Sequence, residues 1–184
     1  MAVRPIVKLP HSVLRSSAEV VPAADIPSPR IQRLISDMKD TLAASADGVG
    51  LAAPQVGAGL CIFLVSEEAT AIDEDAKGTN GTKAAKEWKH FVFINPVLKK
   101  RSRRKTSVVE GCLSVPGKFG EVARSDKVYL EWFDEHGRRH GRGFARFFAR
   151  VIQHEMDHLD GILITDRAGR LLNVTHGAAE HHRS

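Results

Sequence analysis

Apolar side chains recur at two different spacings along the chain, and these spacings predict where helices and strands form. Across residues 143–160 the apolar residues Phe144, Phe147 and Val151 are three or four positions apart, which is the period of an α-helix. Residues 30–44 show the same period. Runs typical of strands occupy residues 60–65, 90–98, 105–110 and 127–133. This order predicts an α+β fold, a single domain with mainly antiparallel strands around the central helix at 143–160.

The predicted central helix carries ionisable side chains on the face where its apolar stripe continues. His154, Glu155 and His158 extend that stripe, so they are expected on the buried side, where surface histidines would not be placed. The two histidines are one helical turn apart, and their rings can reach a single cation. Burying three ionisable groups without partners costs several kcal/mol, and a bound cation satisfies them together. Glu155 lies close enough to exchange a proton with a water molecule at that cation.

A catalytic metal site commonly has three protein ligands, and a cysteine is the candidate for the third. The chain has two cysteines, no Cys-x-x-Cys pair and no secretory signal, so we expect a reduced compartment and no disulfide framework. Cys61 opens a continuous apolar run and is expected to be a buried core thiol. Cys112 follows a glycine at the end of a β-rich segment, where a thiolate can face a metal. Its alternative interpretation is a small buried hydrophobic residue.

A third segment, residues 48–55, is rich in glycine and alanine. Its spacing fits a dinucleotide-binding fingerprint, but that fingerprint must come after a strand and open a helix. Here a predicted helix precedes the segment and Pro54 interrupts its end, so that context is missing. Small residues allow the backbone to approach a ligand closely, and Gln55 offers an amide donor. The alternative is a tight turn that leads into the strand at 60–65.

Three motifs in this order, Gly-Val-Gly-Leu-Ala-Ala-Pro-Gln, Glu-Gly-Cys-Leu-Ser and Gln-His-Glu-Met-Asp-His, resemble the signature motifs of the peptide deformylase family. Supporting similarity covers most of the chain, from Ile6 to Gly161. The resemblance implies an enzyme that removes the formyl group from the initiator formyl-methionine of nascent polypeptides and releases formate. Its substrates would therefore be N-formylmethionyl peptides.

The resemblance also implies roles for individual residues. Cys112, His154 and His158 would bind one divalent metal ion. The preferred ion would be Fe2+, with Zn2+, Ni2+ or Co2+ as alternatives. Glu155 would be the general acid/base. The Gln55 side chain and the Leu113 backbone N–H would stabilise the oxyanion.

The substrate pocket is expected to be narrow, because a formyl carbon carries only hydrogen. Gly50 is expected to border the formyl group together with Gln55, Leu113 and the metal. Val49 and Val151 are the expected walls around the methionine side chain. Arg150 stands where the family more often has an apolar residue, which leaves the side-chain preference open.

Charged residues near the ligands allow two interpretations. Glu110 and Asp157 fit supporting roles, in which they orient the metal ligands or pair with a cation such as Arg124. Purely structural salt bridges fit the same residues.

Two other functions share parts of this pattern. A zinc endopeptidase has the His-Glu-x-x-His element, but its third ligand usually lies downstream, where the chain offers no convincing candidate. A noncatalytic peptide-binding module is disfavoured because every predicted catalytic residue is present.

Composition agrees with one domain over residues 1–184. With 184 residues and 42% hydrophobic content the chain can bury a substantial core, and no apolar run is long enough to span a membrane. Residues 66–89 are expected to form a surface insertion. Residues 171–184 are expected to form a polar, frayed tail rather than a second metal site, although they contain three histidines. No transit peptide is visible, so we expect a bacterial cytoplasmic enzyme or the mature form of an organellar one, from a mitochondrion or plastid.

The formal net charge is +5, and cations gather in residues 99–105. Such a run is usually a solvated loop. The alternative is a transient electrostatic contact with RNA at the ribosome. Because no aromatic residue is interleaved with these cations, we expect no sequence-specific binding of nucleic acid.

Overall fold

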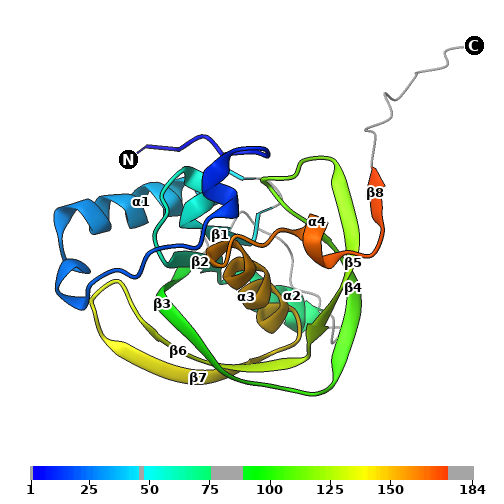
Figure 1. Cartoon of the computed structure of the whole chain (residues 1–184). Coiled ribbons are helices and arrows are strands. Elements are labelled where there is room, and N and C mark those ends of the chain that lie inside the picture. Colours follow the sequence, from blue (N-terminus) through cyan, green and yellow to red (C-terminus); the bar gives the residue numbers. More distant parts are fainter. Residues whose placement is uncertain (1, 46–47, 76–88, 174–184) are drawn as a thin grey trace, which may run out of the picture.

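Two antiparallel sheets and a central helix make up the computed structural model, which describes residues 2–45, 48–75 and 89–173 (Figure 1). The helices are α1 (Pro29–Ala43), α2 (Glu68–Asp75), α3 (Arg146–Leu159) and α4 (Ile164–Arg167). The strands are β1 (Gly50–Ala52), β2 (Ile62–Ser66), β3 (His90–Arg101), β4 (Lys105–Gly111), β5 (Lys118–Ser125), β6 (Lys127–Phe133), β7 (Arg139–Ala145) and β8 (Leu171–Asn173). Short 3-10 turns lie at Ser12–Arg15, Ala23–Asp25 and Ala53–Val56.

The larger sheet has the strand order β1-β2-β3-β6-β7, and its two faces pack against different helices. Alternation along β2 assigns the faces, since successive side chains of a strand point to opposite sides. Ile62 and Leu64 belong to the core cluster that contains the apolar residues of α1. Phe63 and Val65 belong to the cluster that contains those of α3. The sheet therefore separates α1 from α3.

The smaller sheet has the order β4-β5-β8 and supports the other side of α3. Figure 1 shows α3 at the centre of the molecule, with the larger sheet curving around it and β4, β5 and β8 at one side. The Gln153 side chain joins the helix to β5, because its amide pairs with the backbone N–H and C=O of Ser125 at 3.0 and 2.8 Å. This sheet brings the end of β4, and Cys112 after it, to the helix.

The predicted α+β fold is confirmed, and the central helix and α1 lie close to their predicted ranges. Helix α1 begins where Ser28 accepts a hydrogen bond from the Ile31 N–H and Pro29 occupies the first turn. Helix α3 begins at Arg146 and not at 143, because residues 143–145 belong to β7. In that strand Gly143 and Ala145 pair with Tyr129 and Lys127 of β6. Residues at the start of the predicted helix thus belong to a strand.

Three further segments differ from the sequence-based expectation. The predicted insertion at 66–89 begins with α2, in which Ala69 is fully buried, and residues 76–88 lie outside the described part of the chain. The predicted tail contributes β8, which pairs with β5. Its histidines, at positions 176, 181 and 182, fall outside the described residues. The basic run at 99–105 is the end of β3, a short turn and the first residue of β4.

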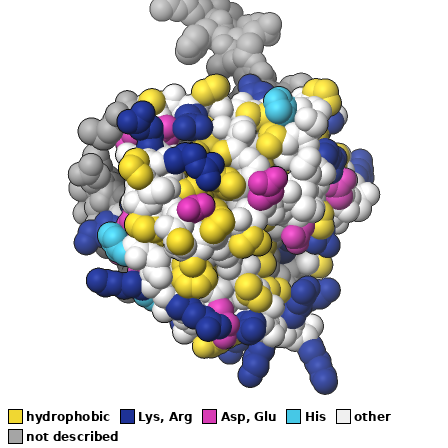
Figure 2. Space-filling view, turned by 60° about the vertical axis from the view of Figure 1, so that its left-hand side comes forward, with side chains coloured by type: hydrophobic (Ala, Val, Ile, Leu, Met, Phe, Trp, Pro, Cys, Tyr) yellow, Lys and Arg dark blue, Asp and Glu magenta, His cyan; other side chains and the backbone are white. Residues whose placement is uncertain are grey.

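The charge of the molecule is unevenly placed. On the face shown in Figure 2, Lys and Arg side chains project mainly from the margins, with acidic and hydrophobic side chains between them. Net charge by itself therefore does not identify a binding surface.

Among the described helices, none has the length and apolar character that crossing a membrane requires.

Candidate functional site

Helix α3 presents His154, Glu155 and His158 to the interior of the molecule. The apolar face of the helix, which includes Val151 and Ile152, packs against the larger sheet. The polar residues continue this face, and the exposed fractions of Glu155 and His158 are only 3% and 1%. The centres of the two imidazole rings are 5.1 Å apart. The prediction that these groups lie on the buried side is confirmed for Glu155 and His158, whereas His154 keeps 14% of its side chain exposed.

Cys112 lies against these histidines, directly after β4. Its Sγ is 3.2 Å from Nε2 of His158, and the ligand atoms of Cys112, His154 and His158 all lie within 4.8 Å of one another. Nδ1 of His154 is 3.0 Å from the Glu110 carboxylate, which directs the other ring nitrogen away from Glu110. One soft thiolate and two imidazoles at this separation form a group that could hold a transition metal ion.

Protonation of the two histidines differs in this pocket. Burial lowers the pKa of His158 well below its usual value, so its ring is neutral, as a ligand requires. Burial opposes the charge of His154 as well, but hydrogen bonds with Cys112 and Glu110 outweigh it and raise the pKa of His154 to about 10. A metal ion must therefore displace a proton when it binds there.

Four alternating charges form a chain behind the ligands. Glu110 accepts two hydrogen bonds from Arg124, both at 2.9 Å. Arg124 also donates to Asp157, which accepts a further bond from Arg167 at 2.6 Å. Burial alone would raise the pKa of Glu110, but the hydrogen bonds from Arg124 and His154 prevail and lower it to about 2. The chain ties β4, β5, α3 and α4 together. Arg167 was not anticipated, since no motif singles it out.

Glu155 is the buried carboxylate beside the ligands. Its Oε2 has no hydrogen-bond partner among the described residues, and burial raises the pKa of Glu155 to about 7. Space for the carboxylate exists because Gly50 has no side chain: a Cβ there would overlap the Glu155 carboxylate and lie 2.9 Å from Cγ1 of Val151. An unpaired acceptor next to three metal-ligand atoms is consistent with a site that holds a cation and a water molecule.

Gln55 approaches the site from the short turn after β1. Its Oε1 accepts a hydrogen bond from the Ala52 N–H at 2.8 Å, which fixes the orientation of the amide. Nε2 consequently lies 3.4 Å from Oγ of Ser114 and 3.9 Å from Sγ of Cys112. The alternative of a plain turn at 48–55 does not account for a fully buried amide directed at a candidate ligand.

The N-terminal segment holds two of the motifs together. The N–H of Val7 donates to the Gln55 carbonyl at 2.8 Å, and the N–H of Leu9 donates to the Ser114 carbonyl at 3.2 Å. Leu113, next to Ser114, is half-buried, and its side chain packs against the α1 cluster. The Ser114 carbonyl on one side of Leu113 is thus held by Leu9, and the Cys112 carbonyl on the other side accepts a hydrogen bond from the Val115 N–H at 2.9 Å.

The expected pocket walls also come together here. Val151 is buried and Val49 half-buried, and both belong to the α3 cluster. The Arg150 guanidinium lies 5.5 Å from the centre of the Phe147 ring. Cys61 packs against the same cluster and is half-buried, not fully buried as expected, and burial raises the pKa of its thiol to about 11, which fits a structural role.

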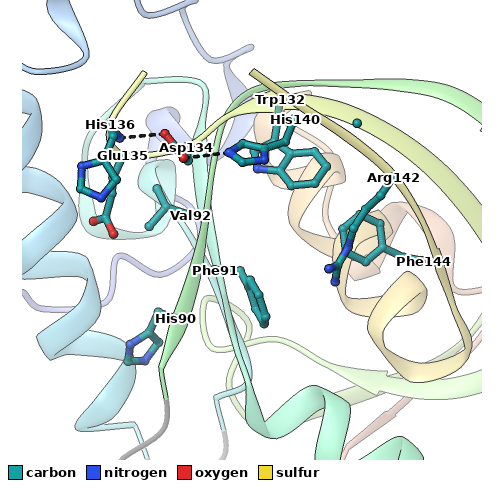
Figure 3. Close-up of a pocket in the computed structure, with 11 residues that line it drawn as sticks. His90, Phe91, Val92, Trp132, Asp134, Glu135, His136, His140, Arg142 and Phe144 are labelled. Atoms are coloured by element: carbon teal, nitrogen blue, oxygen red, sulfur yellow. Dashed lines mark hydrogen bonds and ion pairs between the residues drawn. The ribbon is translucent and has the colours of Figure 1, made fainter. Parts of the chain in front are cut away.

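A hollow of about 370 Å3 lies elsewhere, between the start of β3 and the β6–β7 turn (Figure 3). There Asp134 contacts the ring of His140 at 2.7 Å and accepts a hydrogen bond from the His136 N–H at 2.9 Å. Arg142 lies over the Phe144 ring at 4.5 Å. The candidate metal ligands do not line this hollow, so the chemistry belongs to α3 and the end of β4.

Comparison with known proteins identifies this arrangement. The family model described as polypeptide deformylase matches residues 3–173. The chain belongs to the polypeptide deformylase family. It is therefore an enzyme of that metal-dependent hydrolase family, and neither the endopeptidase nor the noncatalytic module is favoured.

Individual relatives of this deformylase come from bacteria and from a plant. A peptide deformylase of Dehalococcoides mccartyi is 42% identical over 167 residues, which cover 90% of this chain and 86% of the relative. Peptide deformylase 1A, chloroplastic/mitochondrial, of Arabidopsis thaliana is 40% identical over 84% of this chain and 57% of its own length. A Met-Ala-Ser-bound class I type b peptide deformylase of Acinetobacter baumannii superposes with a TM-score of 0.75 at 32% identity, covering 90% of this chain and 98% of that one.

Proposed function

We propose that this deformylase hydrolyses the formyl amide at the initiator methionine of nascent polypeptides and releases formate. One observation carries the proposal: Cys112, His154 and His158 place three ligand atoms within 4.8 Å of one another, beside the buried carboxylate of Glu155. Membership of the family supports the same reaction. We further propose a bacterial cytoplasm or an organelle as its location, since relatives of both kinds exist.

The three ligands would hold one divalent ion, Fe2+ in the first place and Zn2+, Ni2+ or Co2+ as alternatives. When bound, the ion would supply Lewis acidity, which lowers the pKa of a water molecule and polarises a carbonyl group. The Cys112 thiolate is a soft ligand that suits iron and exposes the site to oxidation. Glu110 holds the His154 ring in place for this task.

Glu155 would move the protons of the reaction. It takes a proton from the attacking water and returns it to the departing methionine amine, the two tasks of a general acid/base. Its position suits both, because the carboxylate is fixed on α3 and its Oε2 has no hydrogen-bond partner in the described part of the chain, so that it can take a new one.

The Gln55 amide and the Leu113 backbone N–H would stabilise the negative charge that develops on the formyl oxygen. Gln55 cannot turn its N–H groups away without losing the bond between its Oε1 and the Ala52 N–H. Donors that are fixed before the reaction cost no reorganisation during it, which is why such groups contribute strongly to rate.

Val49, Gly50 and Val151 would surround the substrate. The missing side chain of Gly50 leaves room for a small acyl group next to Glu155. Burial of an unbranched methionine side chain against the two valines would contribute about 1.5–3 kcal/mol. Arg150, one turn before His154, would limit how far the pocket extends along α3.

Substrate discrimination tests the proposal. We expect formate release from formyl-Met-Ala-Ser, very slow reaction of acetyl-Met-Ala-Ser and no cleavage of internal peptide bonds, all measured on protein purified without oxygen with its metal content determined. Cleavage of an internal bond in an unformylated peptide at a comparable rate would instead assign an endopeptidase, provided that Glu155→Gln abolishes it.

Nascent chains are presented at ribosomes, and we propose that the enzyme makes transient electrostatic contact with the ribosome there. The exposed cations at residues 99–105 support this contact.

A further inference from the structure

The ends of three strands border a second hollow, of about 530 Å3, on the larger sheet. It is lined by the end of β3 with Ser102, the start of β6 and the end of β7, which contribute Lys100, Arg101, Lys127, Val128, Tyr129 and Gly143 among others. Figure 1 shows these strands running side by side below α3, away from the helix end that carries the ligands. None of the candidate metal ligands lines the hollow, which is therefore separate from the candidate catalytic site.

The register of the sheet places the Tyr129 ring between a lysine on one neighbouring strand and a glycine, which has no side chain, on the other. Lys100 pairs with Tyr129, and Tyr129 pairs with Gly143, so the three residues form one row across the strands. The Tyr129 hydroxyl lies over Gly141, where an added Cβ would be 3.1 Å away from it. Above Gly143 the nearest atom to such a Cβ is 3.9 Å away, so space remains beside the ring.

The cations of this hollow have no acidic partners among the described residues. The carboxylate of Glu131 is taken by Lys99 and Arg139, at 3.6 and 2.7 Å. The carboxylate of Asp126 is taken by Arg104 at 3.0 Å.

The side chains that remain, Lys100, Arg101 and Lys127, are exposed and form no ion pair within the described part of the chain. Exposed, uncompensated cations around a hollow attract phosphate groups.

We propose that this hollow binds unpaired nucleotides of RNA, with a base stacked on Tyr129 above Gly143 and phosphates at Lys100, Arg101 and Lys127. Single-stranded RNA is bound in this way, by cations that follow the backbone and aromatic rings that stack on bases. The basic run at 99–105 contains no aromatic residue. The fold supplies one from the neighbouring strand β6.

RNA bound in this hollow leaves the catalytic site open. Strand β4 begins at Lys105, three residues after Ser102 of the hollow, leads to Gly111, directly before Cys112, and spans about 20 Å. A peptide and an RNA segment can therefore be held at the same time. Affinity for RNA is independent of the reaction, whereas its use at the ribosome rests on the proposed function.

Two variants separate stacking from charge. We expect Tyr129→Leu to weaken binding of a labelled single-stranded oligoadenylate by roughly fivefold to a hundredfold, while Tyr129→Phe, which keeps the ring, binds like the parent. Binding is measured by fluorescence anisotropy on the metal-loaded full chain. An oligoadenylate duplexed with oligouridylate, whose bases are not free, should bind Tyr129→Leu and the parent alike.

The charge variant carries Lys100→Gln, Arg101→Gln and Lys127→Gln together. Each phosphate contact contributes about 0.7 to the slope of log affinity against log salt for single strands, so the slope should fall by about 2.

A matched control removes the same charge elsewhere, through Arg30→Gln, Arg33→Gln and Arg138→Gln, and should keep the parental slope. All variants should retain the parental rate of formate release from a short formyl peptide, which shows that they are folded.

Several results would overturn the proposal. They are an unchanged oligoadenylate affinity in Tyr129→Leu, an equal loss of slope in the control triple, and binding to anionic phosphatidylglycerol vesicles but not to RNA. A parent chain that binds RNA as described but releases no formate would refute the proposed reaction and leave the RNA site intact.

Discussion

Replacement of Glu110 by Gln removes one charge from the buried chain while it keeps the size of the side chain. Glu110 then no longer neutralises Arg124, which is left with Asp157, and it binds the His154 ring less strongly. The lowering of the Glu110 pKa from 4.5 to about 2 corresponds to about 3 kcal/mol of stability at neutral pH. For a chain of this length, we expect the unfolding temperature to fall by about 6–12 °C.

Metal affinity should fall in the same variant, because Glu110 orients a candidate ligand. Loss of such a supporting carboxylate typically costs about 10–100-fold in affinity. Thermal unfolding of the metal-free protein and metal titration against a competing chelator measure the two effects separately. Glu121→Gln, an exposed site on the neighbouring strand β5, is the matched control and should change neither.

The contribution of Glu110 to the free energy of unfolding should depend on pH in a definite direction. The pKa of Glu110 is lowered in the folded state, so its stabilisation is present above about pH 4.5 and is lost as the pH falls towards about 2. The stability difference between parent and Glu110→Gln should shrink over that window. Equal unfolding temperatures and equal metal affinities at neutral pH would refute the structural role assigned to Glu110.

Three further predictions concern the site itself. Cys112→Ala, His154→Ala and His158→Ala should each abolish tight metal binding, and full metal occupancy in Cys112→Ala by elemental analysis would contradict the ligand set. Glu155→Gln should keep its metal while formate release falls by roughly 10² or more, and an unchanged rate would mean that another base acts. Gly50→Ala should displace the Glu155 carboxylate and reduce turnover with metal content unchanged, and a parental rate would show that the pocket tolerates a methyl group there.

Local sequence patterns predicted the parts of the fold that depend on local spacing. The helical period located α1 and α3, and continuing the stripe from Val151 placed His154 and His158 on the buried face. Strand β7 was missed because its residues before Phe144 are exposed and are glycine or charged and polar, so it shows no apolar alternation. It is defined by pairing with β6, and a pairing partner is not visible in a single segment.

The supporting residues of the site show the same division. The three motifs pointed to Cys112 and Gln55, and to Glu155, because each lies in a distinctive short segment. Arg167 and the Tyr129 hollow depend on contacts between distant segments, such as the bond from Arg167 to Asp157 and the row from Lys100 to Gly143. The local sequence around these residues therefore does not predict either set of contacts.

The N-terminal segment with Val7 and Leu9 affects the stage of synthesis at which the chain becomes active. These residues bind Gln55 and Ser114, and Cys112 in turn meets His158, so the site closes three long loops of the polypeptide at once. Long-range closure of this kind comes late in folding. A growing chain that still lacks α3 contains the N-terminal segment and the Cys112 thiol but no histidine ligands. Catalytic competence should therefore arise in a single step after nearly the whole domain has left the ribosome, and fragments that stop before residue 154 should be inert.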